Sequence, residues 1–316
     1  MAPVASDVGS DGALSIEDLR GNPRRMLTER VVRVALFTAG LTSVVISALI
    51  VGSLVKEAWA FITSVDLGSL WAFGWYPRRG VFDVRTLFVG SLLVAGIAMV
   101  VAGPVGLGTA IYLAEYARPG VRRVLKPIIE ILAGIPSVVL GYFAFAVVSP
   151  DLVQRVRPDA PQANLLAAGI GVGILTIPLV ASVAEDALRS VPGSLREASY
   201  GLGARKVTTS IKVVVPAAVS GLVAALILAV SRAIGETMVV FIAAGGTGGA
   251  TFNVDPAEKG STMTAAMAAV ASGTDQVKGA ANTYQSLFFV GLLLFLITLG
   301  LNIVAGRFVR RVRQRY

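Results

Sequence analysis

One stretch decides the fold class: residues 164–184 read NLLAAGIGVGILTIPLVASVA, without a charged side chain. The run has the length of about 20 residues that a helix needs to cross the hydrocarbon core of a bilayer. Further apolar runs of at least this length lie outside it, at 31–55, 86–113, 128–148, 213–244 and 286–306. The sequence therefore predicts an all-α integral membrane protein with about six transmembrane helices.

The composition also favours a membrane protein and disfavours an enzyme. Of the 316 residues, 55% are hydrophobic and 15% are charged, with a mean hydropathy of +0.75, whereas soluble domains carry about 25% charged residues. The chain has neither cysteine nor histidine, which removes disulfides, thiolate nucleophiles, most zinc sites and the usual acid–base imidazole. We therefore expect no cofactor and no metal site.

The distribution of basic residues predicts the orientation. The net charge is +9, but the charges fall between the apolar runs, which favours a topology signal over nucleic-acid binding. Lys and Arg are concentrated in alternate polar segments, at 20–33, 118–126, 189–212 and 307–315. Because basic loops stay on the cytoplasmic side, both termini are predicted to be cytoplasmic. Residues 1–30 are then a polar tail and residues 31–316 the transmembrane domain. The first run exceeds the roughly 7–15 apolar residues of a signal peptide, so we expect an uncleaved helix.

Two outer segments are longer than simple turns. Residues 56–85 include Trp59, Trp71 and Trp75, and tryptophan favours the membrane interface. In the second outer segment, 245–284, the Ala- and Met-rich stretch from Met263 to Ala271 predicts a short surface helix.

The cytoplasmic segment 190–212 carries several helix signals. Pro192-Gly193 is a turn signal, and Ser194 stands three residues before Glu197, which is the spacing of a capping box. This predicts a helix that begins near Leu195 and ends at Gly201 and Gly203, because glycine favours C-terminal caps.

The same segment resembles the EAA loop of ABC-importer permeases, in which Glu-Ala-Ala, three residues, Gly, nine residues, Ile, one residue and Leu-Pro follow in order. The spacing is complete here, with mild departures in residue type at Ser199, Val213 and Val215. The matching set is Glu197, Ala198, Ser199, Gly203, Val213, Val215 and Pro216. The resemblance implies a coupling helix that docks on an ATP-binding subunit, with Glu197, Ala198 and Gly203 at the docking positions. The chain lacks the Gly-x-x-x-x-Gly-Lys-Ser/Thr phosphate-binding loop, so we expect a partner to hydrolyse the ATP.

Two opposite charges lie inside the fifth run. Arg232 and Glu236 stand four residues apart, flanked by the hydroxyls of Ser231 and Thr237. On one continuous helix they would share a face and could pair, which gives a structural ion pair as one interpretation. The other is an anion site, because charged residues within membrane helices usually face an aqueous path or a protein interior and arginine suits oxyanions.

The role of Glu236 has two interpretations. It could neutralise Arg232 until substrate arrives, or it could accept a hydrogen bond from a protonated oxyanion such as hydrogen phosphate. On a straight helix Arg232 would lie ~24 Å beyond Pro216, in the outer half of the bilayer. Glu130, the other intramembrane carboxylate, is expected to pair with Lys126 at the interface.

Three stretches resemble the permease subunits of phosphate-specific ABC importers. They are residues 106–116, residues 125–139, and the sequence Arg232-Ala233-Ile234-Gly235-Glu236-Thr237-Met238. Met238 in this position is more typical of the PstC-type subunit than of the PstA-type subunit. The resemblance implies the type I ABC importer (MetI-like) permease fold in a bacterial plasma membrane. It also implies a PstA-like permease partner, two ATP-binding subunits and an external phosphate-binding protein.

Other functions remain open from the sequence. A permease for sulfate, molybdate or another oxyanion would carry the same loop, and an ion-coupled secondary transporter would also contain intramembrane charges. A membrane enzyme is the weakest alternative, because no clustered carboxylate pair accompanies the absence of Cys and His.

Overall fold

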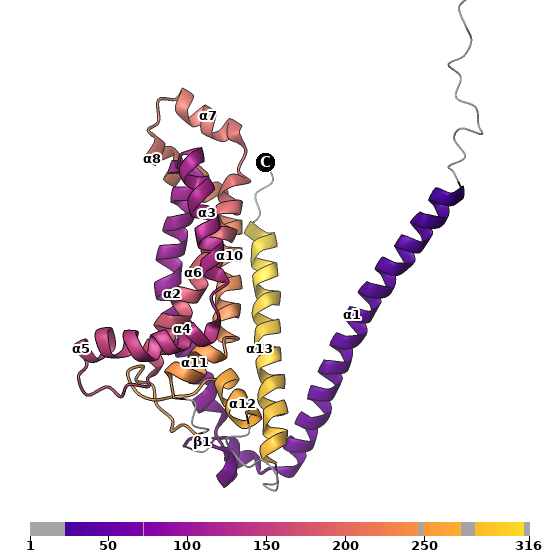
Figure 1. Ribbon diagram of the computed structural model, residues 1–316, viewed down its shortest axis with the longest axis vertical. Coiled ribbons are helices and arrows are strands. Elements are labelled where there is room, and N and C mark those ends of the chain that lie inside the picture. Colours follow the sequence, from indigo (N-terminus) through magenta and orange to yellow (C-terminus); the bar gives the residue numbers. More distant parts are fainter. Residues whose placement is uncertain (1–22, 72, 246–248, 273–281, 313–316) are drawn as a thin grey trace, which may run out of the picture. The chain divides into compact units, whose positions relative to one another are not determined.

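The computed structural model describes residues 23–71, 73–245, 249–272 and 282–312. It is a helical protein with one small β-hairpin (Figure 1). The α-helices are α1 (Pro23–Ser64), α2 (Val84–Ile111), α3 (Pro119–Ala133), α4 (Ser137–Phe143), α5 (Gln154–Val156), α6 (Leu165–Arg189), α7 (Gly193–Gly201), α8 (Lys206–Thr209), α9 (Val215–Ala217), α10 (Val219–Ile234), α11 (Met238–Ala243), α12 (Met263–Ala271) and α13 (Thr283–Val312). Short 3-10 helices lie at Leu67–Trp71 and Pro77–Arg79, and π-helical segments at Tyr112–Tyr116, Ala144–Val153 and Ser210–Val214. The hairpin pairs β1 (Trp75–Tyr76) with β2 (Val81–Phe82) in antiparallel register.

The length and composition of the helices confirm the predicted fold class. In the described part of the chain, five helices are long and apolar enough to cross a membrane, or six if one bent pair counts as a single span. The chain divides into two compact units, residues 1–53 and 54–316, and α1 runs through the boundary between them. Helix α1 already begins at Pro23, inside the segment expected to be a tail, and residues 1–22 lie outside the described residues.

The centre of the second unit is the packing of α2 against α6. Glycines allow the two helices to approach closely: a Cβ added to Gly169 would lie 2.7 Å from Ile97 Cβ, and one added to Gly173 would lie 2.8 Å from Val101 Cβ. Small residues serve this purpose in membrane helices because packing, rather than water exclusion, holds such helices together. Asn164 caps α6, since its side chain accepts a 2.7 Å hydrogen bond from the backbone N–H of Ala167.

The fifth apolar run differs from the single helix that was expected over 213–244. The helical stretches Lys206–Ala217 and Val219–Ile234 meet at a bend of 70°. Pro216 lacks a backbone N–H and so weakens the helix at this point, and Ala218 has a ψ of 0°, which ends α9. The run breaks again after α10, so the distance of ~24 Å that a straight helix would give between Pro216 and Arg232 does not apply.

The third apolar run is also divided, and its boundaries differ from the expected 128–148. Helix α3 ends at Ala133, and a new membrane-length stretch, Ser137–Val156, begins after Pro136. This stretch runs across the direction of α2, α6 and α13 (Figure 1). Glu130 therefore belongs to α3, a helix without buried residues.

Parts of the two segments that were predicted to lie outside the membrane are packed into the protein. Trp75 is 2% exposed and packs against Phe82, which in turn contacts Phe61. Trp59 and Trp71 are exposed, and the interfacial position of the three tryptophans stays a prediction. Helix α12 has the predicted bounds, but most of its side chains are buried and it packs against α13 and α11. The predicted surface helix is thus part of the core.

Candidate functional site

The charged and hydroxyl residues that were predicted to line a path lie within or next to the break between α10 and α11. Helix α10 ends at Ile234, Gly235 caps it, and α11 begins at Met238, so Glu236 lies in non-helical backbone. The backbone carbonyl of Glu236 accepts a 2.7 Å hydrogen bond from the hydroxyl of Thr264 on α12. The link between α10 and α11 lacks helical hydrogen bonds of its own, and this bond attaches it to α12.

The side chains of Arg232 and Glu236 have different surroundings. Arg232 is exposed, whereas Glu236 is only 7% exposed. Both residues lie in the described part of the chain, and the structure records no ion pair between them. The helical spacing that suggested such a pair ends at Gly235. Ser231 is held by a 3.2 Å hydrogen bond to Asn302 on α13, and the hydroxyl of Thr237 lies 3.4 Å from the carbonyl of Gly235.

A cavity of about 720 Å³ adjoins the break. Its lining includes Gly235 and Thr237 from the break, Thr264 and Met267 from α12, and Tyr284 from α13. Non-helical backbone at membrane depth is tolerated only where it is buried in protein or lines a water-filled space. The position of the cavity is consistent with that requirement.

The predicted coupling segment forms the short helices α7 and α8 at the end of the second unit opposite α12 and β1 (Figure 1). Glu197, Ala198 and Gly203 are exposed there. Gly203 has a φ of +76°, which a residue with a side chain adopts with strain. Of the other motif residues, Val213 and Val215 are half-buried and Pro216 is exposed.

Three details of this segment were not foreseen. Helix α7 begins at Gly193 without a side-chain cap, so the capping box predicted from Ser194 and Glu197 is wrong. Ser199 is buried and shares a 2.8 Å hydrogen bond with Thr209, which ties α7 to α8. Leu202 is 90% exposed at the end of α7. The sequence signal that could have singled it out is its position between Gly201 and Gly203, at the predicted end of the helix.

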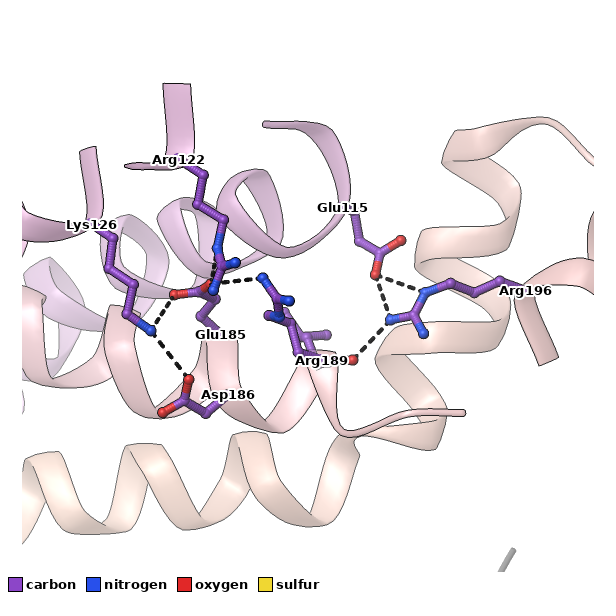
Figure 2. Close-up of polar contacts among 8 residues, drawn as sticks. Glu115, Arg122, Lys126, Glu185, Asp186, Arg189 and Arg196 are labelled. Atoms are coloured by element: carbon purple, nitrogen blue, oxygen red, sulfur yellow. Dashed lines mark hydrogen bonds and ion pairs between the residues drawn. The ribbon is translucent and has the colours of Figure 1, made fainter. Parts of the chain in front are cut away.

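A buried carboxylate, Glu185, was missed by the sequence analysis (Figure 2). It is fully buried on α6, and its Oε1 atom lies 2.6 Å from Arg122 Nη2 and 3.9 Å from Arg189 Nη1. Lys126 Nζ lies 3.2 Å from Oε2, but the two atoms do not have the geometry of a hydrogen bond. The contact between Lys126 and this oxygen is therefore an ion pair only.

Lys126 thus pairs with α6 and not, as expected, with Glu130. Burial lowers the pKa of Lys126, but its contacts with Glu185 and Asp186 outweigh this and raise the pKa above its usual value. The ammonium group therefore stays charged at neutral pH.

A second ion pair joins Arg196 of α7 to Glu115 (Figure 2). Arg196 donates to Glu115 Oε1 at 2.8 Å from Nη2 and 3.2 Å from Nε. The same guanidinium donates to the carbonyl oxygens of Leu188 and Val191, at 2.9 and 2.7 Å. One side chain thus fixes α7 to the end of α6 and to the segment that follows α2.

The sequence that forms this bent helical core matches a known family. Residues 106–314 match the family described as "Binding-protein-dependent transport system inner membrane component". The chain belongs to this family. Its apolar helices and this membership make it a multi-pass protein of the bacterial plasma membrane.

Individual relatives of this inner membrane component carry more specific names. The chain is 29% identical to the phosphate transport system permease protein PstC of Mesorhizobium japonicum, over 92% of this chain and 93% of that protein. It is 31% identical to PstA 1 of Mycobacterium tuberculosis, over 70% and 71% of the two chains. Among solved structures, a chain of the MetNI methionine ABC transporter aligns with a TM-score of 0.53 and 21% identity, over 73% of this chain and 96% of that chain. This last likeness confirms the MetI-like fold.

Proposed function

We propose that this protein is the PstC-type transmembrane permease subunit of an ATP-driven importer of inorganic phosphate. The observation that carries the proposal is an exposed arginine, Arg232, beside a break in an apolar helix that adjoins a cavity. The names of the PstC and PstA relatives support phosphate as the cargo. A PstA-like permease, two ATP-binding subunits and an external phosphate-binding protein would complete the transporter.

In this proposal Arg232, Ser231, Glu236 and Thr237 belong to the substrate path. The guanidinium of Arg232 supplies planar donors that match phosphate oxygens, and the hydroxyls offer further hydrogen bonds. Glu236 is nearly buried, and no side chain in the described part of the chain pairs with it. A buried polar group costs free energy unless a hydrogen-bond partner reaches it. A hydrogen phosphate ion carries a P–OH donor, whereas sulfate has none at neutral pH. This favours the second of the two roles considered for Glu236.

The exposed face of α7 and the turn after it would form the docking surface for an ATP-binding subunit. Glu197, Ala198 and Gly203 are accessible there, and Leu202 adds an apolar side chain that water does not favour. Ser199 has a different role, because it is buried inside the segment and stabilises its shape.

Another oxyanion remains the second candidate cargo, and transport by the assembled complex distinguishes the two. Membrane vesicles containing this chain and its four partner subunits should take up radiolabelled phosphate only when ATP is supplied on the cytoplasmic side. Excess sulfate should not compete. If the assembled complex takes up sulfate or molybdate and no phosphate, the proposed cargo is wrong, and uptake without ATP would indicate a secondary transporter.

Glu236→Gln should reduce phosphate uptake in these vesicles about tenfold, because a hydrogen bond to a charged acceptor contributes about 1.5 kcal/mol or more. Glu130→Gln is the matched control, since Glu130 is an exposed carboxylate on α3. Equal uptake rates for Glu236→Gln and the control would remove Glu236 from the path.

A further inference from the structure

The coupling helix α7 is short, and one side chain provides its strongest polar attachment to the membrane helices. Arg196 is 21% exposed and Glu115 is 4% exposed, so their ion pair is largely removed from water. With its bonds to Leu188 and Val191, Arg196 holds α7 to carbonyl groups at the end of α6. A charged, multidentate contact of this kind is stronger and fixes the geometry better than an exposed ion pair does.

Glu185 continues the attachment from α6 to α3. It lies one helical turn before Leu188, and its carboxylate binds Arg122 and Lys126 of α3 (Figure 2). Because the carboxylate is fully buried, it depends on these cations to offset the cost of burying its charge. Helices α6 and α3 are therefore held together at the end nearest α7.

Helix α3 leads from this cluster toward the break between α10 and α11. After Gly134 to Pro136 the chain continues into α4, which packs against α11. The contact is close: a Cβ added to Gly141 would lie 3.0 Å from the carbonyl oxygen of Met238 and from Val239 Cα. A displacement of α3 would therefore reach the first residues of α11, next to Thr237.

We propose that the pairs Glu115–Arg196 and Glu185–Arg122/Lys126 transmit movement of the coupling helix to the substrate path. Arg196 and Glu185 are positioning residues: they touch neither ATP nor phosphate, but they make α7, α6 and α3 move together. The route runs from α7 through the end of α6, α3 and α4 to α11. This inference rests on the proposed function, because it concerns the coupling of ATP hydrolysis to phosphate movement.

The test measures ATP hydrolysed per phosphate transported in vesicles containing the complete complex. Arg196→Gln and Glu185→Gln should raise this ratio about fivefold or more, which corresponds to the lower range of coupling between distant sites. Arg123→Gln is the matched control, because Arg123 is exposed on the same helix as Arg122 and should leave the ratio unchanged. The double variant Glu115→Gln/Arg196→Gln should be no worse than Arg196→Gln alone, because the two residues share one interaction.

Failure of the inference and failure of the proposed function are distinguishable. If the wild-type complex takes up no phosphate, the proposed function fails. If it does, and the assembled variants keep the wild-type ratio, the coupling role is wrong. If either glutamine variant does not assemble, Arg196→Lys and Glu115→Gln provide the same comparison. Arg196→Lys keeps the positive charge but loses the planar guanidinium that makes several hydrogen bonds at once. A wild-type ratio in both of these would also overturn the proposal.

Discussion

Replacing Arg232 with glutamine is expected to reduce ATP-dependent phosphate uptake about 10- to 150-fold, because a hydrogen bond to a charged group contributes about 1.5–3 kcal/mol. The guanidinium is exposed at the end of α10, where the apolar run breaks. Retaining an exposed arginine in such a run is costly, which argues for a functional reason. The measurement is the initial rate of radiolabelled phosphate uptake into vesicles that contain equal amounts of assembled complex.

The comparison variants separate charge from packing. Arg232→Lys keeps the charge but not the planar fork, so it should retain an intermediate rate. Arg123→Gln removes an exposed arginine from α3 and should transport like the wild type. Wild-type uptake by Arg232→Gln would show that Arg232 has a packing role only.

The second large effect is structural and concerns Gly90 on α2. A Cβ at this position would lie 2.2 Å from the carbonyl oxygen of Ser261, a backbone atom that cannot move freely. Gly90→Ala should therefore lower the free energy of unfolding by about 1–3 kcal/mol, the usual cost of overpacking. Thermal unfolding of the purified complex in detergent measures the change.

Gly96 offers a control of opposite sign on the same helix. A Cβ there meets nothing within 4 Å, and alanine is a better helix former than glycine by about 1 kcal/mol. Gly96→Ala should therefore be neutral or stabilising, and equal destabilisation by the two variants would contradict the packing seen at Gly90.

Gly90→Ala should also slow phosphate uptake. The Ser91 hydroxyl beside it binds the Met263 N–H at 3.0 Å, and α12 supplies Thr264 to the break.

Much of the fold was predictable because membrane insertion depends on long apolar runs. Residues 164–184 become the body of α6, and the turn signal at Pro192-Gly193 with the glycines at 201 and 203 correctly predicted a short helix, α7. The helix breaks were not predicted, because residues 213–244 were expected to form one helix. Pro216 lies at the first break. The end of α10 depends on Gly235, a residue that membrane helices also tolerate within their interiors.

The ion-pair clusters could not be predicted because their partners are distant in the sequence. Glu185 lies directly after an apolar run, and its partner Arg122 is 63 residues away. Lys126 had a nearer acidic neighbour in Glu130, and helical spacing favoured that pair. Tertiary packing instead brings Lys126 to α6. The orientation of the termini stays a prediction from the distribution of basic residues.

The most direct test of the account is the accessibility of Thr237 to a charged, water-soluble thiol reagent. The chain has no cysteine, so Thr237→Cys introduces its one thiol. Val100→Cys on α2 is the lipid-facing control, because the side chain of Val100 is 75% exposed. In the complete complex we expect the reagent to modify position 237 and not position 100, with phosphate slowing the modification and sulfate leaving it unchanged. An unreactive Thr237→Cys, or a reaction rate that phosphate does not alter, would contradict a phosphate path at the α10–α11 break.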